Sequence, residues 1–243
     1  MSSILTNSSA MNALATLKDV NRGLNQTQDR VSTGLKVASG KDNAAYFAVS
    51  ETMKGDSGMF KAINEGMTAT KNSVATARLG AETVSDIAQQ MVERIAFAQS
   101  DGINKQDVQD ELVALAKNMQ SAIDQATFNG DNLVDGVQAA AGPVTVVNGV
   151  SRDATGAFGV TSSTFNAVDL QTIQTTLAAI DVTDSATTMD AKLIAAEGEL
   201  GKAISAATSL GITENTLDGQ MQFIESLTDT LDSGVSSMVD ADM

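Results

Sequence analysis

The sequence predicts a mainly α protein: an elongated antiparallel helical rod with a small irregular or β insertion at the tip and an N-terminal helical arm. Apolar residues recur at seven-residue spacing in two long segments. Aromatic residues make up only 3% of the chain and Trp is absent, so aliphatic side chains must fill the core, which favours closely packed helices. Between the two segments lie the only proline and many Gly, Ser and Thr residues, which predict the insertion.

The first periodic segment lies within residues 46–129 and carries two interleaved apolar series. A helix that buries one narrow stripe produces this pattern. Because the pattern continues for more than five heptads, it predicts a helix roughly 60 Å long at 1.5 Å per residue. The series are Phe60, Met67, Val74, Ala81, Ala88 and Ile95, and Ile63, Thr70, Ala77, Val84, Met91 and Ala98. We expect the rod core to include Val74, Ala81, Val84, Met91 and Ile95.

A second helix of the same region follows Gly102, which supplies a short chain reversal. The two helices should therefore form an antiparallel pair. Asn104 is the expected N-cap, with Asp107 three residues later. The expected core rows are Val108, Leu115 and Ala122, and Leu112, Met119 and Ala126.

The C-terminal region, residues 187–243, repeats the design of the first rod helix. Thr187 and Asp190 resemble a capping signature at its start. Gly211 and Thr213 predict a break or bend before the last long helix. The heptad row consists of Leu210, Leu217, Ile224, Leu231 and Met238, and we expect Leu217, Ile224 and Leu231 to belong to the rod core.

The N-terminal arm, residues 1–45, has a weaker helical pattern and a different charge. It holds five basic and three acidic residues, a net charge of +2, whereas the whole chain carries −15. Asn21 and Gln28 interrupt one of its two apolar rows, so the arm should be marginal alone and should order on binding a partner. We expect subunit association through Leu14, Leu17, Leu24, Val31 and Leu35.

The insertion, residues 130–186, shows little helical periodicity. Val144 to Val147 predict a strand, Asn148-Gly149 predicts a hairpin turn, and Phe158 to Val160 predict a second strand. Asp131, Asn132 and Asp135 lack the spacing of a calcium loop, so we expect a solvated loop there.

Composition excludes several classes of function. The chain has no His and no Cys, which excludes His-based catalysis, thiol nucleophiles, disulfides and zinc–thiolate sites. We therefore expect no enzyme, no cofactor and no metal site. A net charge of −15 disfavours nucleic-acid binding, which needs a basic face. No apolar run is long enough to predict membrane insertion, and the N-terminus lacks a general secretory signal.

Three stretches of the sequence resemble bacterial flagellin. Residues 24–50 read LNQTQDRVSTGLKVASGKDNAAYFAVS, which is similar to the family's N-terminal signature. Phe128-Asn129-Gly130 resembles the family's Phe-Asn-Gly loop. The end, LDSGVSSMVDADM, resembles its C-terminal rod helix. The resemblance covers residues 1–135 and about 190–243.

The resemblance implies a structural subunit of the bacterial flagellar filament. Such subunits self-assemble through terminal helices for motility, with the arm in the inner tube and the variable insertion at the surface. They are secreted, extracellular proteins of the flagellum. The implied partners are other subunits, the flagellar export apparatus, a chaperone, and the filament cap and junction proteins. The alternatives are a hook–filament junction protein and a surface adhesin-like helical protein.

Two departures from the family pattern bear on assembly and on host recognition. Family members continue beyond the Val-Asp-Ala-Asp stretch into another helix, so we expect the arm to lack that partner within this sequence. In many flagellins a stretch reading Gln-Arg-Val-Arg-Glu-Leu-Ala faces the Toll-like flagellin receptor. Here Met91 replaces the first arginine and Glu93-Arg94 inverts the next pair, which predicts weak or absent recognition. The receptor-facing residues are Gln90, Met91, Glu93 and Arg94.

Overall fold

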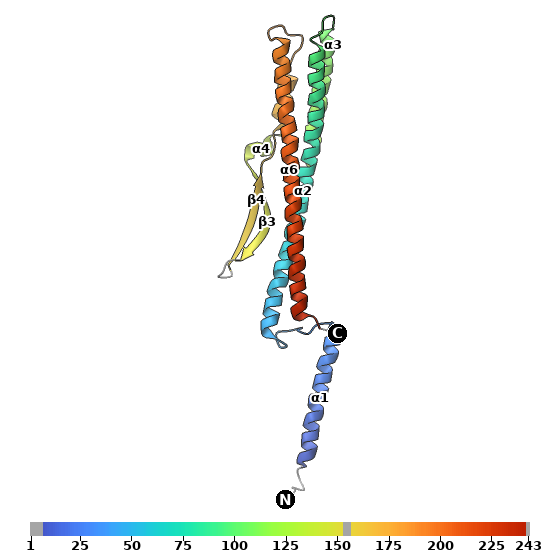
Figure 1. The fold of residues 1–243 in the computed structure, drawn as a ribbon, viewed down its shortest axis with the longest axis vertical. Coiled ribbons are helices and arrows are strands. Elements are labelled where there is room, and N and C mark those ends of the chain that lie inside the picture. Colours follow the sequence, from blue (N-terminus) through green and yellow to red (C-terminus); the bar gives the residue numbers. More distant parts are fainter. Residues whose placement is uncertain (1–6, 153–156, 242–243) are drawn as a thin grey trace. The chain divides into compact units, whose positions relative to one another are not determined.

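The computed structural model describes residues 7–152 and 157–241 and has a mainly α architecture (Figure 1). Two helices are very long, and each continues from one compact unit of the chain into the other. The helices are α1 (Ser8–Thr33), α2 (Ala44–Phe97), α3 (Lys105–Gln125), α4 (Val137–Ala141), α5 (Leu170–Ala178) and α6 (Met189–Val239). The strands are β1 (Thr127–Phe128), β2 (Asp131–Asn132), β3 (Val144–Arg152) and β4 (Phe158–Phe165).

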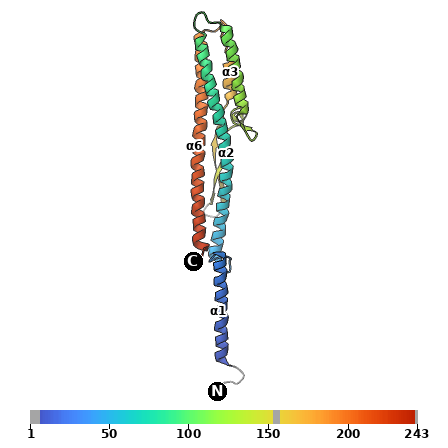
Figure 2. The same ribbon diagram turned by 90° about the vertical axis from the view of Figure 1, so that its right-hand side faces the viewer.

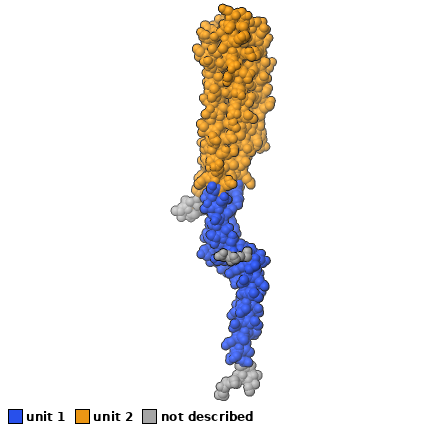
Figure 3. All heavy atoms as spheres, turned by 45° about the vertical axis from the view of Figure 1, so that its right-hand side comes forward, with its two compact units in different colours: residues 1–61, 226–243 blue, residues 62–225 orange. Residues whose placement is uncertain are grey.

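The chain divides into two units, residues 1–61 with 226–243 and residues 62–225 (Figure 3). The first unit contains α1, the start of α2 and the end of α6. Within it, Asp232 of α6 accepts hydrogen bonds from two residues of α2, the Ser57 hydroxyl at 2.6 Å and the Lys61 ammonium at 2.9 Å. These bonds, with a buried Ser57, hold the two helices together in this unit.

The second unit is built from the rest of α2 and α6, from α3 and α5, and from the short strands (Figure 2). The Arg78 guanidinium of α2 donates to Glu214 of α6 at 2.8 Å, and Lys71 pairs with Asp218. Since higher numbers on α2 face lower numbers on α6, the two helices are antiparallel. The Gln120 amide of α3 and the Gln171 amide of α5 bond to each other at 2.9 and 2.8 Å. The large, fully buried side chains of this unit include Met67, Val74, Val84, Met91, Ile95, Leu112, Met119, Ile123, Leu170, Leu177, Leu210 and Ile224.

Helix α2 passes close to the C-cap of α3 at Gly80. A Cβ atom at this position would lie 2.6 Å from the Ala126 Cβ atom, well inside normal contact distance. Glycine therefore allows the contact.

The buried residues of α3 differ in part from the predicted core rows. Ala116 and Ile123 are buried, whereas the predicted Leu115 and Ala122 are half-buried.

The insertion differs from the sequence prediction in three respects. Asn148-Gly149 is a bulge inside β3 and not a hairpin turn, because the strand continues to Arg152 in antiparallel register with β4. The hairpin lies against α2, where Thr145 and Val146 face Ile63 and Gly66 across a groove, and not at the tip of the helices. Helix α5 was not predicted at all.

The predicted break at Gly211 and Thr213 is also wrong, because α6 is one continuous helix. The Thr213 hydroxyl donates to the Ser209 carbonyl at 3.0 Å, a bond that a threonine makes within a helix. Leu210 and Leu217 on either side are buried, so tertiary packing outweighs the low helix propensity of Gly211.

Candidate subunit-association surface

Helix α1 forms because both of its ends are capped and its interior contains no proline. The Asn7 side chain accepts the Ala10 N–H at 3.1 Å, which satisfies one of the free donors of the first turn. Gly34 adopts φ 68° and its N–H donates to the Arg30 carbonyl at 2.8 Å, a left-handed C-cap. Arg30 itself lies in the last turn, where a positive charge is favourable.

No residue of α1 is buried, although the helix carries a row of large apolar side chains. Half or more of each side chain in this row is exposed. Exposed apolar residues gathered on one helix mark a surface that another molecule covers. The exposed row consists of Met11 (63%), Leu14 (52%), Leu17 (56%), Val20 (60%), Leu24 (55%) and Val31 (62%). At 3.6 residues per turn this row winds around about half of the helix, with Leu17, Val20, Leu24 and Val31 on one side and Met11 opposite Val20.

Leu14, Leu17, Leu24 and Val31 of the predicted association row thus lie exposed on α1. Leu35 does not, because the helix ends at Thr33 and Leu35 is half-buried in the following link. Sequence reasoning missed Met11 and Val20, which lie three residues from Leu14 and Leu17. The three-residue spacing from Met11 to Val20 was the available signal.

The link after α1 is paired with the end of α6 within the first unit. The Lys36 and Val37 N–H groups donate to the Val239 carbonyl at 2.7 and 3.2 Å. The Ala241 N–H donates to the Gly34 carbonyl at 2.9 Å. Val37 and Val239 are both buried, so the base of α1 is held by backbone bonds and by an apolar contact region.

Asp42 closes the link just before α2 begins. Its carboxylate accepts the Ser39 N–H at 3.0 Å, and also the Ser39 hydroxyl and the Ala38 N–H at 3.2 Å. The pKa of Asp42 is lowered from its ordinary value of 3.8, first by the Ser39 N–H and further by the Ser39 hydroxyl and the Arg30 charge. The charged form of Asp42 therefore stabilises this turn.

The predicted rod-core residues all lie on α2 and α6. All but one of these residues are buried, and Leu231 is half-buried near the end of α6. The buried ones are Val74, Ala81, Val84, Met91, Ile95, Leu217 and Ile224.

The stretch predicted to face the Toll-like receptor lies on α2. Met91 is fully buried in the core of the second unit. Gln90 and Glu93 are exposed, and the Glu93 carboxylate accepts the Gln89 amide at 3.3 Å. The Arg94 guanidinium pairs with Glu111 of α3 at 3.0 Å. The exposed surface here therefore offers one arginine, which already has a partner.

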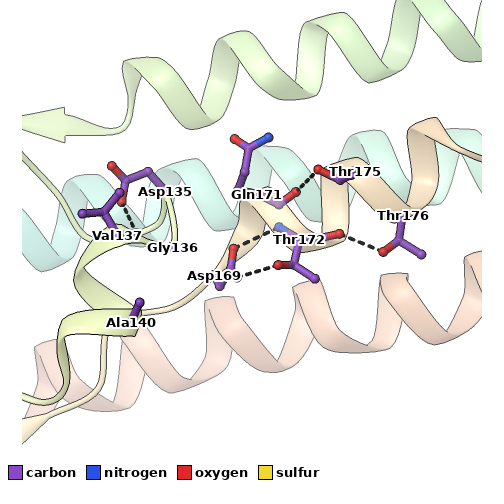
Figure 4. A pocket seen from close by; sticks show the side chains of 9 residues that line it. All are labelled: Asp135, Gly136, Val137, Ala140, Asp169, Gln171, Thr172, Thr175 and Thr176. Atoms are coloured by element: carbon purple, nitrogen blue, oxygen red, sulfur yellow. Dashed lines mark hydrogen bonds between the residues drawn. The ribbon is translucent and has the colours of Figure 1, made fainter.

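A hollow of about 460 Å³ lies beside α5, and its carboxylates act as local caps (Figure 4). Asp169 accepts the Thr172 N–H at 2.9 Å and also the Thr172 hydroxyl. Asp135 accepts the Val137 N–H at 2.9 Å. Over residues 7–152 and 157–241, no three His, Cys, Asp or Glu side chains gather as metal ligands. Within the same ranges, no helix has both the length and the apolar character needed to cross a membrane.

The fold is that of a helical structural protein, and its helix α1 exposes large apolar side chains. A model of the bacterial flagellin N-terminal helical region matches residues 4–139. The chain therefore belongs to the bacterial flagellin family, whose members are structural subunits of the flagellar filament and not enzymes.

Two relatives align with the whole chain. Flagellin C of Rhizobium meliloti (strain 1021) is 30% identical over 291 residues, covering 88% of that protein. Flagellin of Brucella melitensis biotype 1 is 32% identical over 254 residues, covering 87% of that protein. Flagellin A of R. meliloti (strain 1021) is 36% identical over 162 residues, which span 66% of this chain and 41% of the relative.

Solved structures share the fold. Bacillus cereus flagellin superposes with a TM-score of 0.53 at 18% identity, over 65% of this chain and 88% of that chain. A putative flagellar hook-associated protein from Vibrio parahaemolyticus gives a TM-score of 0.62 at 15% identity, over 82% of this chain and all of that chain. At these identities the likeness concerns the fold alone. The whole-length flagellin relatives, and not the hook-associated structure, therefore decide the family.

Proposed function

We propose that this chain builds the flagellar filament by joining other copies through the apolar row of α1. The observation that carries the proposal is a capped helix with six large apolar side chains, none of them buried. In this proposal residues 1–45 form the associating arm, 46–129 and 187–243 form the helical body, and 130–186 form the outward insertion.

Burial of the α1 row contributes to the driving force for association. Burying a Val, Leu or Met side chain fully contributes about 1.5–3 kcal/mol, so a side chain that is half exposed gains about 1 kcal/mol. The six side chains of the row together contribute on the order of 6 kcal/mol before the entropy of association is subtracted. Each subunit would meet several neighbours in a filament, and the contacts would then add.

Charge distribution supports the same role for the arm. Residues 1–45 carry a net charge of +2, so the rest of the chain carries −17. Copies that meet through their arms therefore bring together the part of the chain with the least mutual repulsion. If the arms lie at the centre of the filament, the acidic parts of the subunits are kept farther apart.

The backbone pairing at Gly34 to Val37 supports a fixed attachment of the arm. Three residues at the base of α1, Gly34, Lys36 and Val37, are tied to Val239 and Ala241, while α1 beyond them makes no buried contact within the chain. A helix that is fixed at its base and exposed along its length is suited to bind neighbouring copies.

Family membership supports the remaining partners and the location. A filament subunit reaches the extracellular flagellum through the flagellar export apparatus, with a chaperone, and meets the cap and junction proteins at the filament ends. We include these partners in the proposal because every whole-length relative above is a flagellin.

Weak or absent recognition by the Toll-like flagellin receptor belongs to the same proposal. Met91 is buried and Arg94 is paired with Glu111, so the exposed stretch lacks free arginines at these positions. Loss of a central arginine from an interface commonly costs about 2 kcal/mol or more when it is a hot spot. A receptor reporter assay should therefore show little response to the purified protein, and full potency at nanomolar protein would contradict this part.

The filament role is tested by shearing filaments from cells that produce the chain and identifying the subunit by intact mass and peptide mapping. We expect peptides from α1, α2 and α6 in the main band. Filaments that contain other subunits but none of these peptides would contradict the proposal.

A further inference from the structure

A small pocket of the second unit lies where α2, the β1–β2 turn and the paired ends of β3 and β4 meet. It has a volume of about 180 Å³, and α2 contributes only the small side chains Ala69, Thr70 and Ser73 to its lining. A cavity of about 150 Å³ accepts a benzene molecule, so this pocket has room for a ligand of about six non-hydrogen atoms.

Two phenyl rings line the pocket, and strand pairing fixes the position of each. Phe165 at the end of β4 is the register partner of Val144, which lines the same space. Phe128 of β1 is the register partner of Asp131 of β2. Because opposite residues of an antiparallel pair project to the same face, the ring and the carboxylate both reach the pocket. We call this space the Phe128–Phe165 pocket.

The polar side chains at the pocket are without partners inside the chain. Of the described residues that line it, only Asp131 is charged. Over residues 7–152 and 157–241 its carboxylate has no hydrogen-bond or ion-pair partner, whereas Asp124 accepts the Gln120 amide at 2.9 Å. Within the same ranges the side chains of Ser73 and Asn129, which also line the pocket, form no hydrogen bond either.

These groups match one primary ammonium ion that carries a short alkyl chain. An –NH₃⁺ group has three N–H donors and no acceptor. The Asp131 carboxylate, the Asn129 side-chain oxygen and the Ser73 hydroxyl oxygen offer three acceptors, and the bond to the carboxylate is strengthened by charge. Phenyl rings also attract a nearby cation and provide an apolar surface for the alkyl chain. Asp131 and the net charge of −15 repel an anionic ligand.

We propose that the Phe128–Phe165 pocket binds a small primary alkylammonium ion, whose –NH₃⁺ group bonds to Asp131, Asn129 and Ser73 while its alkyl chain contacts the two phenyl rings. The bound ion joins the β1–β2 turn to α2 and therefore stabilises the folded second unit. This inference goes beyond the filament function, because it requires neither the α1 row nor a second copy of the chain.

A nuclear magnetic resonance titration of the isotope-labelled, dissociated subunit with n-pentylammonium chloride tests the site. The backbone amide signals of Thr70, Asn129 and Gly130 should shift and reach a plateau as the amine concentration rises. Asp131→Asn keeps the size of the side chain and removes its charge, so it should weaken binding by about tenfold or more. Ser73→Ala removes one acceptor and should weaken binding by a smaller factor.

Three controls separate this site from general attraction of cations to an acidic protein. Asp124→Asn removes the same charge outside the pocket and should bind the amine like the parent chain. Sodium chloride at equal concentration, and 1-pentanol, which has the same alkyl chain without the charge, should give no saturating shift at Gly130. Absence of a plateau with the amine, equal affinity of Asp131→Asn and the parent, or an equal response to 1-pentanol would overturn the proposal and leave the filament function standing.

Discussion

Two glycines of helix α2 should respond differently to the same substitution. Gly80 and Gly66 both lie in the helix interior, and neither has a positive φ. A Cβ atom added at Gly80 would lie 2.6 Å from the Ala126 Cβ atom, whereas a Cβ atom at Gly66 has nothing within 4 Å. Gly80→Ala therefore tests the close approach of α2 and α3, and Gly66→Ala is its matched control.

The expected magnitudes follow from two effects. Replacing Gly by Ala in a helix stabilises it by about 1 kcal/mol, and both variants gain this amount. Carbon atoms in contact are separated by about 3.5–4.0 Å, so Gly80→Ala must push the helices apart by roughly 1 Å. Overpacking of this kind costs about 1–3 kcal/mol. Gly66→Ala should gain about 1 kcal/mol, and Gly80→Ala should be about 1–3 kcal/mol less stable than Gly66→Ala.

Thermal unfolding followed by circular dichroism measures both changes on the dissociated subunit. For a chain of this size, 1 kcal/mol corresponds to about 2–4 °C in Tm. Gly66→Ala should raise the Tm by that amount, and Gly80→Ala should unfold below Gly66→Ala. An equal rise in Tm for both variants would show that α2 and α3 are not in close contact at Gly80.

Two further substitutions test the core and the ion pairing. Met91→Ala removes a fully buried side chain and should cost about 2–5 kcal/mol in urea unfolding, whereas Val113→Ala at an exposed site should change stability by less than about 0.5 kcal/mol. The Ser57 hydroxyl, followed by the Lys61 ammonium, lowers the pKa of Asp232 from 3.8, so its contribution to stability is present above pH 3.8 and is lost as the pH falls through its lowered pKa. Asp232→Asn should therefore lie below the parent in Tm near pH 6 and approach it at lower pH, and a constant difference down to pH 2 would contradict that assignment.

The long helices could be predicted from the sequence because their signal repeats many times. Val74, Met91 and Ile224 each occupy a heptad position, and each is buried. A pattern that continues over many turns is insensitive to one unusual residue. For the same reason Gly211 does not break α6, since Leu210 and Leu217 keep the helix packed.

The insertion was harder to predict because its signals are short and local. Asn-Gly occurs twice in this part of the chain, with Asn129 just before the insertion and Asn148 within it. Asn129 has φ 52° and Gly130 has φ 91°, the conformation of a two-residue hairpin turn between β1 and β2. Asn148-Gly149 instead forms a bulge within β3, because β3 continues past it and pairs with β4. The dipeptide alone does not encode this strand pairing.

Helix α5 was not predicted because it has only nine residues. Leu170, Ile173 and Leu177 are buried at helical spacing, and the Asp169 side chain caps the Thr172 N–H. These features were visible in the sequence, but they lie next to strand-like residues. The exposure of the α1 row could not be predicted from periodicity, because an apolar stripe looks the same whether it is buried within the chain or displayed for another copy.

Filament assembly by two α1 variants tests most directly the claim that copies join through this helix. Leu17→Glu places a charge in the exposed apolar row, and Gln26→Glu places the same charge on the opposite side of α1, where the residue is also exposed. Sedimentation and electron microscopy then measure polymer at increasing subunit concentration. We predict that Gln26→Glu assembles like the parent chain and that Leu17→Glu stays largely in the supernatant. Normal filaments from Leu17→Glu would contradict the account.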